Sequence, residues 1–192
     1  MIFEVLNVIT EEINSYFDGT LVTLDNIATI DAEHGDNSNN TSGIILSLLN
    51  LQEEFSLKNV SNHYVNGDEV NYRNPKVNIN LFILFSAKQA TYTESLKGLS
   101  KILEFFQGKH VFTQDNTTYD RDLEGMEKLK NFKFIIDLYT PSFEELNFIW
   151  GTLGGKQYPS VIYKVSLLEI ERDILQRTGT VITQIDNLLK RN

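Results

Sequence analysis

The side chains best suited to acid–base or metal chemistry are three histidines, and they are scattered along the chain. His34, His63 and His110 each lie in a stretch that we predict to be a loop. A metal site needs imidazole or carboxylate ligands that converge, and none of the three has a second histidine at ligand spacing. Ordinary surface histidines explain this pattern best, and we therefore predict no metal ligand among them.

Adjacent glutamates occur three times and could suggest paired carboxylates for acid–base work. The pairs are Glu11-Glu12, Glu53-Glu54 and Glu144-Glu145. Neighbouring side chains on a strand point to opposite faces, and on a helix they diverge by about 100°, so neither arrangement aims both carboxylates at one substrate. Solvated faces and favourable charges at helix N-termini are the better explanation.

A glycine-rich run, Gly151 to Lys156, superficially resembles a phosphate-binding loop. The P-loop motif requires a glycine six residues before the lysine and lies between a strand and the helix that follows it. Here that position is Trp150, and the glycines follow a predicted helix. We interpret Gly154-Gly155 as a left-handed helix C-cap instead. A Gly-x-Ser-x-Gly nucleophile elbow is not present in the sequence either.

The acidic run from Asp115 to Glu127 could bind calcium, but it lacks the spacing of an EF-hand and is more typical of a solvated loop. The chain has no cysteine, which excludes thiol catalysis, disulfides and thiolate metal sites. From these residues we predict no catalytic residue, no cofactor and no metal.

The composition limits the possible classes of protein further. The chain has 192 residues, 41% hydrophobic and 22% charged, which is typical of one globular domain. Its net charge of −9 should repel a phosphate backbone, so nucleic-acid binding is disfavoured. We find neither a signal peptide nor an apolar run long enough to cross a membrane, and we expect a protein made and folded in the cytoplasm.

The first half of the sequence predicts a helix and several strands. Apolar residues at three- and four-residue spacing predict a helix over 1–17, on a face made by Ile2, Leu6, Ile9, Ile13 and Phe17. A β-rich stretch follows at 20–30, and the polar run 31–42 must be a surface loop. A long strand starts at Ile45, is covered on both faces at first and becomes polar on one side. Residues 58–75 are interpreted as a second loop with turn signals.

The second half repeats a strand–helix–strand pattern twice. Strand 77–86 precedes a helix whose capping box is Thr91 with Glu94, and strand 132–138 precedes one whose capping box is Ser142 with Glu145. A strand over 158–168 follows the second helix. The predicted core stripes are Tyr92, Leu96, Leu99, Leu103 and Phe106 on the first helix, and Phe143, Leu146, Ile149 or Trp150, and Leu153 on the second.

These elements predict an α/β (α+β) fold, in which helices pack on a mixed β-sheet made of two strand–helix–strand units plus an N-terminal helix. Residues 108–131 are expected to be a long irregular stretch with a short strand near Val111. We expect a main domain over 1–170 and a C-terminal arm, strand or helix, over 171–192. Trp150, the only tryptophan, is predicted to lie in the core.

Three groups of residues, in a fixed order along the chain, carry a resemblance to a known family. They are Gly43 to Asn50; Asn74-Pro75 with Val77 and Asn80-Leu81; and Ser142 to Gly154 with Tyr158 to Val161 and Tyr163 to Val165. Together they resemble the N-terminal domain of cap (tail-terminator) proteins of phage-tail-like extracellular contractile injection systems. The resemblance spans about residues 1–170, and its most specific part is Trp-x-x-Leu-Gly followed by Pro-Ser-x-x-Tyr.

This resemblance implies a structural protein and not an enzyme. Family members form a six-fold ring that closes the tube and contractile sheath at the end distal to the baseplate. It therefore implies, as partners, further copies of the chain together with sheath and inner-tube proteins, in a particle assembled in the cytoplasm that cells can release. Some members carry a further C-terminal region. Alternatives are another adaptor or baseplate subunit of the same particle, or a small-molecule-binding α/β domain with a pocket beside Gly154-Gly155.

A cap must match the last ring of sheath and tube on one face and offer nothing to a further ring on the other. Leftover strand edges of the particle could be satisfied by β-addition. We expect the contacts in the polar segments 31–42, 58–75 and 108–131 and in the arm 170–192.

Overall fold

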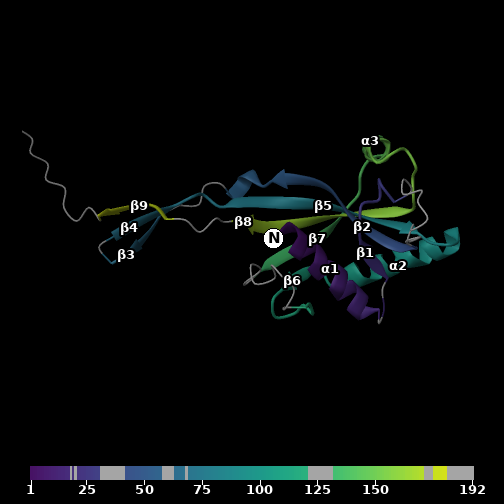
Figure 1. Cartoon of the computed structure of the whole chain (residues 1–192), viewed down its shortest axis with the longest axis horizontal. Helices are drawn as coiled ribbons and strands as arrows, with labels where there is room; N and C mark the ends of the chain where they lie inside the picture. Colours follow the sequence, from purple (N-terminus) through teal and green to yellow (C-terminus); the bar gives the residue numbers. More distant parts are fainter. Residues whose placement is uncertain are drawn as a thin grey trace, which may run out of the picture. The chain divides into compact units, whose positions relative to one another are not determined.

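The computed structural model describes residues 1–17, 19, 21–30, 42–57, 63–67, 69–120, 132–170 and 175–180 (Figure 1). The helices are α1 (Ile2–Tyr16), α2 (Tyr92–Gly108) and α3 (Phe143–Thr152), with a short 3-10 turn η1 (Phe55–Leu57). The strands are β1 (Val22–Leu24), β2 (Gly43–Glu53), β3 (His63–Asn66), β4 (Glu69–Arg73), β5 (Val77–Lys88), β6 (Val111–Thr113), β7 (Lys133–Tyr139), β8 (Ser160–Ile170) and β9 (Leu175–Thr180).

The chain forms two compact units, and each draws on two separate segments. The larger unit contains Met1–Glu53 and Ile79–Leu168, and the smaller contains Glu54–Asn78 and Glu169–Asn192. The expected division into 1–170 and 171–192 stays a prediction. The described strand β9 lies within the expected arm, and residues 181–192 lie outside the described residues.

The larger unit is built on a six-stranded mixed sheet in the order β1-β2-β5-β8-β7-β6. β1 pairs with β2 in parallel, whereas the β2–β5, β6–β7 and β7–β8 pairs are antiparallel. The strand–helix–strand units are β5-α2-β6 and β7-α3-β8. The predicted fold class, a mixed sheet with helices packed on it, is confirmed.

The helices cover both faces of this sheet. α1 and α2 pack on one face, where Ile9 and Ile102 join strand residues such as Phe85 in the main core cluster. α3 packs on the other face, where Trp150 joins Leu84 and Ile162 in a second cluster. Figure 1 shows α3 set apart from α1 and α2. The central strands are therefore apolar on both sides, as the sequence around Ile45 predicts.

Local sequence signals set the helix ends as predicted. The Thr91 side chain accepts a hydrogen bond from the Glu94 N–H, and the Glu94 carboxylate accepts one from the Thr91 N–H, which completes a capping box. Ser142 and Glu145 form the same motif at α3. The φ angles of Gly154 and Gly155 are +102° and +79°, in the region that only glycine adopts readily, so the interpretation of these residues as a turn after the helix is confirmed.

The predicted core faces of the two capped helices are partly wrong. On α2 the buried residues are Ser95, Gly98, Leu99, Ile102, Phe105 and Phe106, whereas Tyr92, Leu96 and Leu103 are exposed. On α3 the side chain of Phe143 is 93% exposed. Close approach explains the rotation of α2, because a Cβ at Gly98 would lie only 2.8 Å from the Ile44 side chain. The small residues Ser95 and Gly98 therefore face the sheet.

The smaller unit contains a three-stranded sheet in the order β3-β4-β9. β3 and β4 form a hairpin in which Asn66 pairs with Glu69, and β4 pairs on its other side with β9. The prediction that 58–75 is a loop is wrong for 63–66 and 69–73, which are strands, whereas 58–62 and 68 lie outside the described residues. Asn66 ends β3, and Gly67, which follows it, has a φ of +62°, as tight hairpin turns require.

Candidate assembly surfaces

The side chains with potential for chemistry do not gather in the described structure. His63 lies on strand β3, so its predicted loop position is wrong; His110 lies in the connection between α2 and β6, and His34 lies outside the described residues. Among residues whose placement the structure gives, no group of three or more histidine, aspartate or glutamate side chains could hold a metal ion. In the same residues, no helix is long and apolar enough to cross a membrane.

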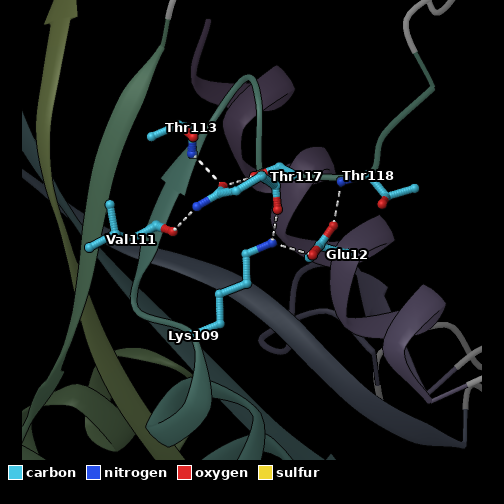
Figure 2. A network of polar contacts seen from close by, with 7 residues as sticks. Glu12, Lys109, Val111, Thr113, Thr117 and Thr118 are labelled. Atoms are coloured by element: carbon cyan, nitrogen blue, oxygen red, sulfur yellow. Dashed lines mark hydrogen bonds and ion pairs between the residues drawn. The ribbon is translucent and has the colours of Figure 1, made fainter.

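One pair of glutamates has a structural role that the sequence did not indicate. The Glu12 carboxylate on α1 forms an ion pair with Lys109 and accepts a hydrogen bond from the Thr118 N–H at 2.6 Å (Figure 2). Glu11 accepts one from the Asp120 N–H at 2.7 Å. The interpretation of Glu11-Glu12 as a solvated face is therefore wrong, because these carboxylates fix the loop that follows β6.

Hydrogen bonds within the same loop also stabilise it. The Asn116 side-chain oxygen accepts a hydrogen bond from the Thr113 N–H at 2.8 Å, and its amide group donates to the Val111 carbonyl at 3.0 Å. Lys109 donates to the Asn116 carbonyl (Figure 2). The described part of 108–131 is thus tied to the larger unit. Residues 121–131, which complete that predicted contact segment and the acidic run, lie outside the described residues.

We expect Glu12→Ala to lower the free energy of unfolding by about 2 kcal/mol. The change removes two charge-assisted contacts at a site where the Glu12 and Lys109 side chains are only 13% and 22% exposed. Urea denaturation measures the loss, and hydrogen exchange at the Thr118 amide locates it. Glu12→Gln, which keeps the size and an acceptor oxygen, should lose less. Unchanged exchange at Thr118 in Glu12→Ala would contradict the assigned contact.

A groove of about 540 Å³ lies between α2 and β7. Its apolar lining comes from Leu103, Phe106, Ile136, Leu138 and Tyr163, and its acidic lining from Glu104 and Asp137. The rims are exposed, since Leu138 is 55% and Leu103 is 42% accessible. Apolar side chains left uncovered beside a hollow are typical of a protein contact. The sequence missed this feature because the predicted stripe of α2 placed Leu103 in the core.

Tyr163, at the base of this groove, should make stability depend on alkaline pH. The residue is 3% exposed, and burial raises its pKa to about 12. In the unfolded chain the hydroxyl titrates near 10. Because the unfolded chain loses this proton at lower pH than the folded protein, the free energy of unfolding is highest below about pH 10. It then falls by roughly 2 kcal/mol as the pH rises through about 12.

Urea denaturation at about pH 9.5 and about pH 12 measures this loss. The same experiment on Tyr163→Phe isolates the contribution of one hydroxyl from the general alkaline titration of lysines and other tyrosines. Equal pH dependence in the two proteins would show that Tyr163 ionises normally in the fold.

The outer strands of the six-stranded sheet are short, and within the described residues they leave parts of the sheet edges without a neighbouring strand. β1 pairs only with Ile44–Leu46 of β2, and β6 pairs only with Lys133–Ile135 of β7. No described strand pairs with the outer side of β2 beyond Leu48 or of β7 beyond Ile136. Open strand edges accept a further strand through backbone hydrogen bonds.

Of the four predicted contact segments, the structure brings two together. Part of 58–75 and part of 170–192 lie side by side as β4 and β9. The segment 31–42 lies outside the described residues except for Ser42.

The sequence profile of the Pvc16 N-terminal domain family matches residues 4–184. A comparison with curated proteins gave no match. Among solved structures, the chain is similar to the sheath/tube terminator of an extracellular contractile injection system, PVC, in the extended state, with a TM-score of 0.63 and 15% identity. It is also similar to the anti-feeding prophage cap, described as the AFP tube terminating cap, with a TM-score of 0.60 and 13% identity.

The two similarities cover 100% and 95% of this chain but only 64% and 59% of those proteins. At this level of identity they establish a shared fold. The profile match over nearly the whole chain establishes more: the chain belongs to the Pvc16 N-terminal domain family. The resemblance carried by the three groups of residues is thereby confirmed.

Proposed function

We propose that this chain is a structural cap that closes the baseplate-distal end of the tube and sheath of a contractile injection system. The observation that carries the proposal is the match of the whole chain to the fold of two proteins described as terminators. Family membership over residues 4–184 supports it. In this proposal the chain acts through its surfaces and is not an enzyme.

The proposed cap is a homohexameric ring that binds sheath and inner-tube proteins, does not bind nucleic acid and does not insert into a membrane. Head-to-tail contacts close a ring when the rotation between neighbours divides a full turn, and a closed ring can end a polymer. The net charge of −9 is unfavourable for a phosphate partner and supports a protein partner. Assembly takes place in the cytoplasm, as part of a particle that the cell can release.

Electron microscopy of particles made with and without this chain tests the proposal. Particles assembled from sheath, tube and baseplate proteins plus this chain should carry extra density at the distal end, and particles made without it should have open distal ends. Density at the baseplate end would favour the adaptor or baseplate alternative. Particles that never bind the chain, together with a ligand that raises its melting temperature, would favour the small-molecule-binding alternative.

A further inference from the structure

The six-stranded sheet has two outer edges, formed by β2 and β7 where β1 and β6 do not cover them. The uncovered part of β2 and the uncovered part of β7 lie at opposite ends of the strands. Ile44 of β2 pairs with Ala87 of β5, whose N–H donates to the Pro159 carbonyl, just before β8. β8 places Ile162 beside Tyr139, the last residue of β7. The end of the sheet where β1 covers β2 is therefore the end where β7 is open.

At the other end the arrangement is reversed. Ser166 of β8 pairs with Ile135 of β7, which in turn pairs with Val111 of β6. At this end β2 extends beyond the last residue of β1 as far as Glu53, which pairs with Ile79 of β5. The described strands thus cover half of each edge of the sheet, and the covered halves are diagonally opposite. A staggered edge-to-edge arrangement of two copies would therefore bring the uncovered part of β2 beside the uncovered part of β7 and leave the pairing of β1 and β6 in place.

The side chains at both open edges lie on the same face of the sheet. A bulge between Leu48 and Asn50 places Leu48 opposite Ile83 and Leu51 opposite Leu81, and both partners belong to the core under α1 and α2. Leu138 follows Ile136 by two residues and shares that face. All copies in a closed ring present equivalent faces, so Leu48 and Leu51 of one copy meet the groove beside Leu138 of the next.

The backbone groups are also suitably directed. The Ile136 N–H donates outward to the His110 carbonyl, and alternate residues of a strand direct their polar groups to the same side, so those of Leu138 also point outward. On β2, the Glu54 N–H donates inward to Asn78, which places the groups of Leu51 on the outer side. There the Asn50 side-chain oxygen accepts a hydrogen bond from the Leu51 N–H at 2.8 Å, a contact that a partner strand replaces. Both leucines are exposed, Leu51 at 46% and Leu138 at 55%, and each lies beside an uncovered part of the sheet edge.

We propose that copies of this chain join by adding the outer edge of β2 (Leu48–Gln52) of one copy to the outer edge of β7 (Asp137–Tyr139) of the next, with Leu48 and Leu51 entering the groove between α2 and β7. The contact is heterologous, which is the kind that closes into a ring. The inference rests on the proposed function for the ring itself, and it names the surface through which that ring forms.

Cysteine cross-linking tests this contact, because the natural chain contains no cysteine. Leu51→Cys and Leu138→Cys proteins are prepared separately, mixed and treated with a short thiol cross-linker, alone and in the presence of sheath and tube proteins. The mixture should give a covalent dimer that neither single variant gives alone. The double variant should give a ladder that ends at the closed ring.

Phe148→Cys is the matched control, since its side chain is 63% exposed and lies on α3, on the other face of the sheet. Leu51→Cys mixed with Phe148→Cys should give little product. Equal yields for the two mixtures, or no product from Leu51→Cys with Leu138→Cys in either setting, would overturn the proposed contact.

A charge exchange provides a second test. Leu51→Glu should weaken self-association about tenfold or more, because it adds a carboxylate to a groove already lined by Glu104 and Asp137. Leu138→Lys should weaken it less, because those two carboxylates lie close enough to pair with the ammonium. The double variant carries both charges at every junction of the ring and should regain most of the association. Urea denaturation should be nearly unchanged in all three, since both side chains are exposed.

The outcomes separate this inference from the proposed function. Rings that persist in both single variants would overturn the edge contact and leave the cap intact. Cross-linked rings that never occupy the distal end of particles would overturn the cap and leave the edge contact intact.

Discussion

Replacing Trp150 with alanine is expected to lower the free energy of unfolding by about 3–5 kcal/mol, a large share of the stability of a domain this size. The side chain is 4% exposed and lies between α3 and the sheet, in contact with the cluster that contains Ile45, Leu84 and Ile162. Alanine removes most of the apolar area that attaches α3 and leaves a cavity. Denaturant unfolding followed by far-ultraviolet circular dichroism measures the loss, because the variant has no tryptophan fluorescence.

Trp150→Phe is the informative control. The indole N–H of Trp150 is buried and has no hydrogen-bond partner among the described residues, so phenylalanine removes an unsatisfied donor while it keeps an aromatic ring. We expect it to retain most of the stability. A Trp150→Ala loss below about 1 kcal/mol would mean that α3 is held mainly by its other contacts.

Features encoded by neighbouring residues could be predicted from the sequence. The two capping boxes, the glycine turn after α3 and the burial of Trp150 each depend on a few adjacent side chains and on chain stereochemistry. The predicted α1 face was right for the same reason, because five apolar residues repeat at helical spacing. Local patterns of this kind gave the fold class and the two strand–helix–strand units.

Features that depend on distant parts of the chain could not be predicted in this way. Lys109 and Glu12 are 97 residues apart, and nothing in either local sequence indicates their contact. The buried face of α2 is set by the approach of Gly98 to Ile44, which outweighs the apolar residues Tyr92 and Leu96. The hairpin of β3 and β4 did carry a local signal, Asn66-Gly67, but its partner β9 lies about a hundred residues further on.

The candidate assembly surface also depends on distant parts of the chain. Leu51 and Leu138 have the same character in the sequence as leucines that the fold buries. Their exposure follows only from the shortness of β1 and β6 and from the order of strands in the sheet. Sequence periodicity identifies which side chains share a face, whereas the topology decides which edge of the sheet stays open.

Replacing Asn71 with proline is expected to unfold the small sheet while the larger unit stays folded. Asn71 lies on β4, the central strand, where it pairs with Tyr64 on one side and Thr178 on the other. Proline has no N–H for the ladder, and its ring is not accommodated in a central strand, a penalty of about 3 kcal/mol or more. Hydrogen exchange should show lost protection in β3, β4 and β9.

Trp150 reports on the other unit, because α3 belongs to the larger one. Its fluorescence in Asn71→Pro should therefore match that of the natural chain. Asn71→Ala keeps the backbone N–H and separates the effect of the lost side chain from that of the broken ladder. If exchange in α1 and α2 rises together with exchange in β4, the two units unfold cooperatively, and the small sheet is part of what stabilises the core. If only the small sheet is lost, binding of this variant to particles tests whether that sheet contributes to capping.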